Sequence, residues 1–167
     1  QLYYQGLFNE SMIDAAKARR IAEELQDSLL IASSLNQVAV LLEEQDDNRQ
    51  AIVLLRDALR WYPVASTCTY PITQPHRIHN NLGRCWANMG ALDSARASEE
   101  RSLRLAVQAK VPRGTALALL ELGRLQLRKQ APDSALALFD RAIDTAAAHA
   151  IHDVLLDGLG ARAEALV

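Results

Sequence analysis

One pattern of small residues recurs about every 40 positions along the chain. A small residue opens each copy of the pattern, and a second one follows seven positions later. The opening residues are Ser11, Ala51, Ala95 and Ala135, with gaps of 40, 44 and 40, and the second residues are Ala18, Ala58, Ser102 and Ala142. Twelve positions before the last three copies stand Ala39, Gly83 and Gly123, each preceded by an apolar residue. A period in this range indicates a stack of repeated units.

The spacing within each copy predicts helices. Ala135, Leu138, Phe139 and Ala142 lie three and four positions apart, which places them on one helix face. Glycine or alanine lets two antiparallel helices approach closely where they cross. Half of the residues are apolar, and glycine and proline together make up only 12 of 167. This composition is typical of a helical protein with short loops.

The periodicity predicts eight helices, at about residues 9–25, 27–45, 47–62, 75–90, 92–109, 112–130, 132–149 and 151–166. Asp47 and Gln50 have the spacing of a capping box, and Pro112 and Pro132 suit the first turn of a helix. The stretch 62–75 is irregular and is predicted to be a loop. Residues 1–6 are interpreted as the end of a preceding helix.

These residues resemble the tetratricopeptide repeat. The resemblance is carried by Leu82, Gly83, Trp86, Gly90, Ala95 and Ser102 in one copy and by Leu122, Gly123, Ala135, Phe139 and Ala142 in the next. Three features depart from that family: its period is about 34, Glu99 stands where a large aromatic residue is usual, and the proline that usually closes a repeat is missing. The extra residues are interpreted as longer helices, as in the long-repeat relatives found in bacterial signalling regulators.

The resemblance implies an all-α fold, a right-handed superhelix of stacked antiparallel helix pairs. Residues 1–167 are expected to form one such domain. Its repeats would cover about 1–26 in part, 27–66, 75–110, 111–150 and 151–167 in part. The last stretch looks like the first helix of a pair whose partner is missing, so the chain is interpreted as a fragment of a longer protein.

The first helices of successive pairs are expected to line a concave groove. The residues three before and one after the small residue should then face that groove, and residues one turn further out should border it. The predicted groove residues are Asn36, Val40, Arg77, Asn80, Arg84, Asn88, Leu120 and Arg124. Asparagine amides bind peptide backbones, and arginine binds carboxylates or phosphates through paired hydrogen bonds.

Family resemblance implies that this groove holds a peptide or a partner segment. The alternative is that these residues are solvated, or that the arginines pair with Glu43 and Glu121. Arg84→Ala combined with Arg124→Ala is expected to abolish binding with melting nearly unchanged.

Other functions have little support in the sequence. His76 with His79, and His149 with His152, are interpreted as structural or surface residues because no further metal ligand has suitable spacing. No catalytic motif, cofactor-binding motif or membrane-spanning segment is visible. The net charge of −2 and the scattered arginines argue against nucleic-acid binding. Two cysteines favour a reducing, cytoplasmic compartment, with a periplasmic location left open.

The expected function is therefore that of a noncatalytic binding or sensor module in a larger bacterial signalling protein. Analogy with the long-repeat relatives suggests a diguanylate cyclase, a histidine kinase or a DNA-binding domain as its output. The alternative is a self-association scaffold that forms a homodimer through the convex face or an open repeat end. Val154, Leu155, Leu159 and Leu166 are the apolar residues expected to be exposed at that end.

Overall fold

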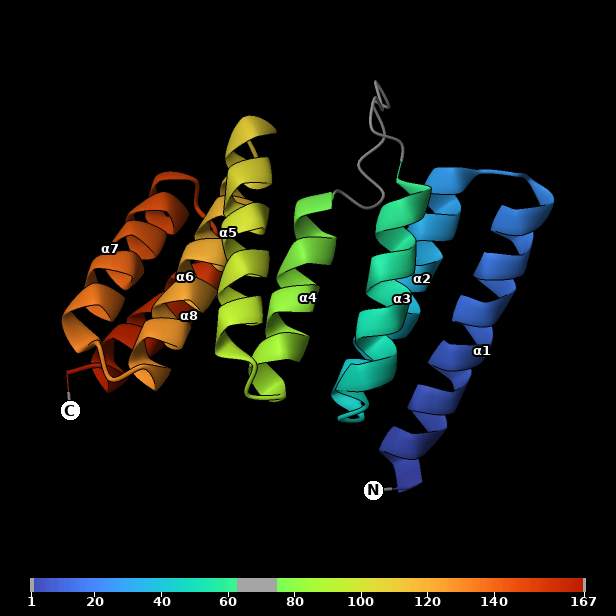
Figure 1. The fold of residues 1–167 in the computed structure, drawn as a ribbon, viewed down its shortest axis with the longest axis horizontal. Helices are drawn as coiled ribbons and strands as arrows, with labels where there is room; N and C mark the ends of the chain where they lie inside the picture. Colours follow the sequence, from blue (N-terminus) through green and yellow to red (C-terminus); the bar gives the residue numbers. More distant parts are fainter. Residues whose placement is uncertain (1, 63–74, 167) are drawn as a thin grey trace.

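The computed structural model describes residues 2–62 and 75–166, and these residues form eight helices and no strand (Figure 1). The helices are α1 (Leu2–Glu24), α2 (Ser28–Glu44), α3 (Asn48–Trp61), α4 (Pro75–Asn88), α5 (Leu92–Gln108), α6 (Pro112–Arg128), α7 (Pro132–Ala148) and α8 (His152–Glu164). The all-α prediction is confirmed. Apart from the start of α1, every helix end lies within two residues of its predicted place. The irregular segment predicted at 62–75 lies largely outside the described residues.

The predicted break near Gly6 is wrong. Helix α1 runs without interruption from Leu2 to Glu24. A single glycine inside a helix costs only about 1 kcal/mol relative to alanine, and no proline reinforces it here. The chain therefore begins with one long helix where two shorter ones were predicted.

The described turns between helices share one conformation. Each contains three residues, and the middle one has a positive φ: Gln26, Asp46, Gly90, Lys110, Gln130 and Ala150. In the first turn, the backbone N–H of Asp27 donates to the carbonyl of Ala22 and that of Gln26 donates to Glu23, which is a Schellman motif. Two helices of 17 residues and two such turns account for the 40-residue period.

The predicted helix starts are confirmed by their caps. The Asp47 carboxylate accepts a hydrogen bond from the backbone N–H of Gln50 at 3.2 Å. Pro112 and Pro132 are the first residues of α6 and α7. Asp27 caps α2 in the same way, because its carboxylate accepts from the backbone N–H groups of Leu29 and Leu30.

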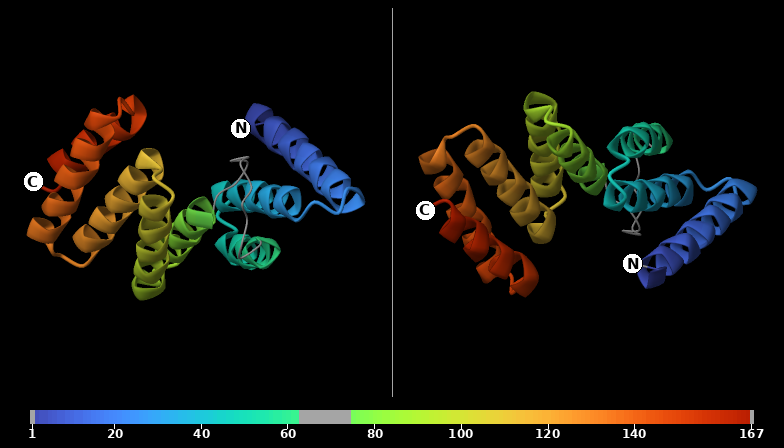
Figure 2. Two further views of the ribbon diagram at one scale, coloured as in Figure 1. Left: turned by 90° about the horizontal axis from the view of Figure 1, so that it is seen from above. Right: turned by 90° about the horizontal axis from the view of Figure 1, so that it is seen from below.

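The helices stack as a row of antiparallel pairs, α2 with α3, α4 with α5 and α6 with α7. Viewed nearly end-on, they form a zigzag with α1 at one end and α7 and α8 at the other (Figure 2). The first helices of successive pairs, α2, α4, α6 and α8, contact one another, whereas the described second helices, α3, α5 and α7, do not. A row whose members are closer together on one side curves toward that side. The first helices therefore form the inner, concave face.

The repeated small residues lie at the helix crossings. Ala51, Ala58, Ala95, Ser102, Ala135 and Ala142 are all buried. A side chain added at Gly123 would overlap the ring of Phe139, and one added at Gly83 would overlap the carboxyl group of Glu99. The two glycines thus mark the closest approach of α6 to α7 and of α4 to α5.

The prediction for the apolar residues at the end of the array holds in part. Leu159 is 48% exposed and Leu166 is 62% exposed, as expected. Val154 and Leu155 pack against α6 and α7 in a small core cluster, Val154 buried and Leu155 at its edge. The expectation that these two residues are exposed was wrong.

Candidate binding groove

Two adjoining hollows lie on the concave face. One has a volume of about 400 Å³ and is lined by His76, Arg77, Asn80, Asn81, Arg84, Ser102, Val111, Arg113, Gly114 and Leu117. The other has a volume of about 650 Å³ and is lined by Ser11, Asp14, Ala15, Ala18, Asn36, Gln37, Val40, Leu41, Arg77, Asn81 and Arg84. Because both are lined by Arg77, Asn81 and Arg84, they form one continuous depression across α1, α2, α4 and α6. We call this depression the groove.

Arg84 is held in the groove by an ion pair. Its guanidinium group donates to the carboxylate of Glu43 on α2 at 2.8 Å. Glu43 is buried and its other oxygen has no partner among the described residues. Burial raises the pKa of Glu43, although the charge of Arg84 and its hydrogen bond oppose that shift. The pairing of Arg84 with Glu43, the alternative predicted from sequence, is confirmed.

Two further arginines on α6 are also paired. Both terminal nitrogens of Arg113 donate hydrogen bonds to the carboxylate of Asp153 at the start of α8. Arg124 donates to Glu121 on its own helix at 2.6 Å and to Asp157 on α8. The predicted pairing of Arg124 with Glu121 is therefore confirmed. These ion pairs join α6 to the next first helix.

Arg77 differs from these three arginines. It is exposed and lines both hollows. Within the described part of the chain, no carboxylate lies within ion-pair distance of its side chain. The smaller hollow is lined by three arginines and by no Asp or Glu. Because Arg84 and Arg113 are paired with Glu43 and Asp153, Arg77 is the arginine of this wall that has no carboxylate partner among the described residues.

Asparagine side chains link the groove to the helices behind it. The amide of Asn81 donates to the side-chain oxygen of Asn36 at 2.9 Å, which joins α4 to α2. The amide of Asn80 donates to the carboxyl group of Glu99 at 2.9 Å, which joins α4 to α5. These contacts fix the amides before any ligand arrives.

Five of the eight predicted groove residues line the groove: Asn36, Val40, Arg77, Asn80 and Arg84. Asn88 lies on the surface beyond it, where its amide donates to Asn48 at 3.1 Å. Arg124 is tied to α8 and lines neither hollow.

The prediction for Leu120 is wrong, because its side chain is fully buried. Leu120 packs in a core cluster with Phe139 and Ala135 of α7. The position three before the small residue therefore faces the second helix of the pair in α6. Asn36, at the same position in α2, is also buried.

Several lining residues were not among the predicted ones, and Gln37, Asn81 and Arg113 are three of them with polar side chains on the first helices. Gln37 and Asn81 stand two positions before the small residues Ala39 and Gly83. With 3.6 residues per turn, this position lies only about 60° around the helix axis from the predicted position one after the small residue, so it faces the same side. Extending the predicted face by one position would have found both residues. Arg113 had no such signal, because it lies in the first turn of its helix.

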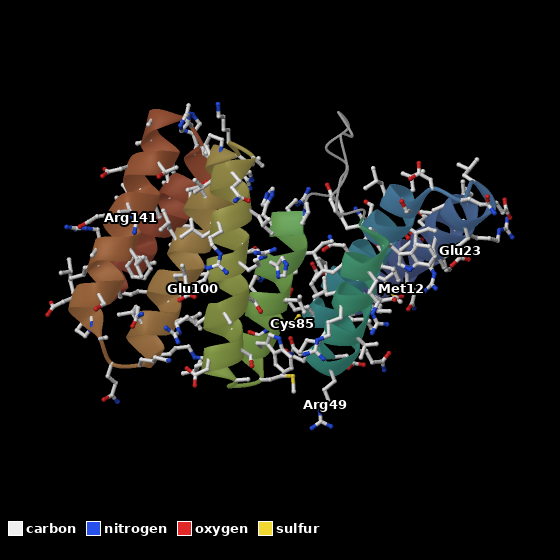
Figure 3. The ribbon with its side chains drawn as sticks, turned by 45° about the horizontal axis from the view of Figure 1, so that its top comes forward. Met12, Glu23, Arg49, Cys85, Glu100 and Arg141 are labelled. Atoms are coloured by element: carbon white, nitrogen blue, oxygen red, sulfur yellow. The ribbon has the colours of Figure 1, made fainter. Side chains whose placement is uncertain are left out.

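His76 and Cys85 are buried and His79 is half-buried, and all three lie on α4. Burial lowers the pKa of His76, with a contribution from the nearby charge of Arg77. Burial, together with Arg101 and Arg104, lowers the pKa of His79 to about 4. Cys85 is buried on α4, inside the array (Figure 3), and burial raises the pKa of its thiol to about 12. Its thiol is therefore protonated at neutral pH and a poor nucleophile.

Metal-binding clusters and membrane-spanning helices are not found among the described residues. No group of three or more His, Cys, Asp or Glu residues there is placed to hold a metal ion. None of the described helices combines the length and the apolar character that a membrane span needs.

Comparison with known proteins shows the fold alone. No family model and no curated protein matches the sequence. The structure is similar to that of the apo form of RapI, with a TM-score of 0.77 and 15% identity over 97% of this chain and 60% of that one. It is also similar to BtubC (BKLC) from P. vanneervenii, with a TM-score of 0.67 and 17% identity over 83% of this chain and 57% of that one. The chain thus spans about three fifths of each. Its fold is a tetratricopeptide-like α-solenoid.

Proposed function

We propose that this chain is a noncatalytic module that binds an extended segment of another protein in the groove, and that the bound segment places an acidic group at Arg77. The observation that carries the proposal is the exposed Arg77, which has no ion-pair partner among the described residues and lies where the two hollows join. A charge-assisted hydrogen bond to arginine is stronger than a neutral one. Arg84 and Arg113 in the same wall are already paired with Glu43 and Asp153, so Arg77 supplies the charge that would hold the anion.

The groove also offers hydrogen-bonding partners for a peptide backbone. Gln37 is exposed on α2, and Asn80 and Asn81 are half-exposed on α4. An amide side chain both donates and accepts, so it matches the alternating N–H and C=O groups of an extended chain. These residues are held on helices, which supports a preformed site.

We further propose that the module works within a larger bacterial signalling protein, as a sensor for an output domain such as a diguanylate cyclase, a histidine kinase or a DNA-binding domain. This placement rests on the resemblance to long-repeat tetratricopeptide regulators. Fold alone does not specify function, so the ligand of the groove is the property to test first.

The test is selection of a random linear peptide phage library on the immobilised chain. The wild type and Arg141→Ala should enrich peptides that contain Asp or Glu. Arg141 serves as the matched control because it is an exposed arginine that points away from the array on α7 (Figure 3). Arg77→Ala should bind a synthetic copy of an enriched peptide at least about tenfold more weakly, the loss expected for one charge-assisted contact. Equal binding by Arg77→Ala, or no enrichment by the wild type, would refute the proposal.

A further inference from the structure

Helix α6 begins without an acidic residue. The first N–H groups of a helix have no partner inside it, and the helix dipole places partial positive charge at this end. Five of the other helices have an aspartate there, either as the N-cap or in the first turn: Asp27 for α2, Asp47 for α3, Asp93 for α5, Asp133 for α7 and Asp153 for α8. The N-cap of α6 is Val111, and its first turn holds no acidic residue.

The start of α6 opens into the smaller hollow of the groove. Val111, Arg113 and Gly114 all line that hollow. Pro112 has no N–H, and Thr115 donates the first hydrogen bond of the helix, to the carbonyl of Val111. No side chain of the described residues caps this end. The backbone N–H groups of Arg113 and Gly114 are therefore left as donors for a ligand or for water.

A buried histidine faces the same turn of α6. His76 on α4 is only 4% exposed and lines the same hollow. Its Nε2 and Cδ2 atoms lie so close to Gly114 that a side chain added there would overlap them. Neither ring nitrogen has a hydrogen-bond partner among the described residues. Buried polar groups nearly always have such a partner, so His76 is an independent sign that a ligand completes this hollow.

Arg77 supplies a positive charge to the same hollow. Its side chain lines the hollow, and no Asp or Glu does so. The guanidinium group of Arg113 is turned away to Asp153, which leaves only the backbone N–H of Arg113 for a ligand.

We propose that the start of α6, together with His76 and Arg77, is a carboxylate-binding site. The backbone N–H groups of Arg113 and Gly114 and the Nε2–H of His76 donate to the carboxylate oxygens, which have about four acceptor positions, and Arg77 supplies the opposite charge. This inference deepens the proposed function and rests on it, because it places the acidic group of the bound segment. That group is either an Asp or Glu side chain or the end of the segment, since both present the same two oxygens.

The site is tested first with acetate alone, so that the result does not depend on a peptide. Sodium acetate should shift the backbone amide signals of Arg113 and Gly114 and the ring signals of His76 in nuclear magnetic resonance spectra, and the shifts should saturate. Sodium chloride at the same ionic strength should give much smaller shifts. Equal shifts with both salts, or no shift with acetate, would overturn the proposal.

A new N-cap tests where the anion is held. Val111→Asp places a carboxylate where it satisfies the same N–H groups from within the chain, so this variant should melt no lower than the wild type and should not bind acetate. Ala131→Asp is the matched control, because Ala131 is the N-cap of α7 and lines neither hollow. It should bind acetate like the wild type. Acetate binding that survives Val111→Asp, or that both variants lose equally, would exclude the start of α6.

Two substitutions of His76 test the contribution of its ring. His76→Gln keeps a side-chain N–H donor and should bind acetate with nearly the affinity of the wild type. His76→Leu removes the donor and should bind at least about tenfold more weakly, with helicity unchanged by circular dichroism. Equal affinities for these two variants would remove His76 from the site.

An enriched peptide from the phage selection separates this inference from the proposed function. The peptide should bind Ala131→Asp but not Val111→Asp. Its binding should be lost either when its Asp or Glu is replaced by the amide or when its C-terminus is amidated, which identifies the bound carboxylate. Acetate binding without peptide enrichment would refute the proposed function alone. Peptide binding that depends on Arg77 but is unchanged in Val111→Asp would refute this inference alone.

Discussion

The pairs α4/α5 and α6/α7 have the same close helix crossing, but a polar side chain fills it in the first pair and an aromatic one in the second. Each has a glycine on its first helix, and the facing position of its second helix holds Glu99 in one pair and Phe139 in the other. Both facing side chains are at most 1% exposed. The phenyl ring fills its site with apolar contacts. Glu99 places one carboxyl oxygen against the Asn80 amide and leaves the other without a partner in the described structure.

Because a carboxyl group and a phenyl ring occupy equivalent places, the small residues determine the spacing of the paired helices more than the side chains opposite them do. A buried polar group without a hydrogen bond costs about 1–3 kcal/mol in proteins. The α4/α5 pair tolerates that cost because the rest of its crossing, through Ala95, Ser102 and Ala106, is closely packed. Ser102 also donates a hydrogen bond to the backbone carbonyl of His76 at 2.8 Å.

Replacing the buried aromatic side chain of the α6/α7 pair by a carboxyl group should change the free energy of unfolding the most. Phe139→Glu removes a fully buried ring and introduces a carboxyl group in a site that offers no counterpart of Asn80, where α6 has Leu120. The free energy of unfolding should fall by at least ~4 kcal/mol, measured by urea denaturation followed by circular dichroism. Phe139→Leu, the apolar control, should lose about 1–2 kcal/mol. Equal losses for the two variants would show that cavity formation alone matters at this position.

Replacing the buried carboxyl group of the α4/α5 pair by an apolar side chain should stabilise the protein. Burial raises the pKa of Glu99 well above its ordinary value of 4.5. The folded state therefore binds a proton that the unfolded state releases above pH 4.5, and the stability contributed by this group is lost as pH rises. Between the unfolded and folded pKa values, the loss is about 1.4 kcal/mol per pH unit. Glu99→Met should remove this loss and raise the free energy of unfolding at pH 7 by about 1–2 kcal/mol.

The pH dependence separates this effect from a general gain in packing. The advantage of Glu99→Met over the wild type should be smallest at pH 4.5 or below and should grow toward neutral pH. Glu100→Met is the control on the same helix, because Glu100 is only half-buried and lies beside Arg96, and surface pairs of this kind contribute little. A pH-independent advantage for Glu99→Met would show that Glu99 does not carry a raised pKa.

The sequence was sufficient to predict the helices and their order, because these depend on local periodicity, caps and small residues. It located the concave face for the same reason. It could not decide between solvated and paired arginines, since Arg84 and Glu43 are 41 positions apart and their pairing depends on how α2 and α4 stack. The structure also changes the expectation for Arg84→Ala with Arg124→Ala. Removing Arg84 leaves the buried carboxylate of Glu43 unpaired, so that variant should lose stability as well as any binding.

The turns inside the two pairs differ in whether the residue with positive φ carries a side chain, and this difference should have the smallest effect on stability. Gly90 joins α4 to α5 with φ of 78°, and Gln130 joins α6 to α7 with φ of 59°. A side chain in this left-handed region costs roughly 1 kcal/mol, which glycine avoids. Gln130→Gly should therefore raise the free energy of unfolding by about 0.5–1 kcal/mol, and Gly90→Ala should lower it by a similar amount, both measured by urea denaturation. Nothing lies within 4 Å of a side chain added at Gly90, so a loss there reflects backbone conformation and not crowding. If both substitutions shift stability in the same direction, backbone strain in these turns does not distinguish the two helix pairs.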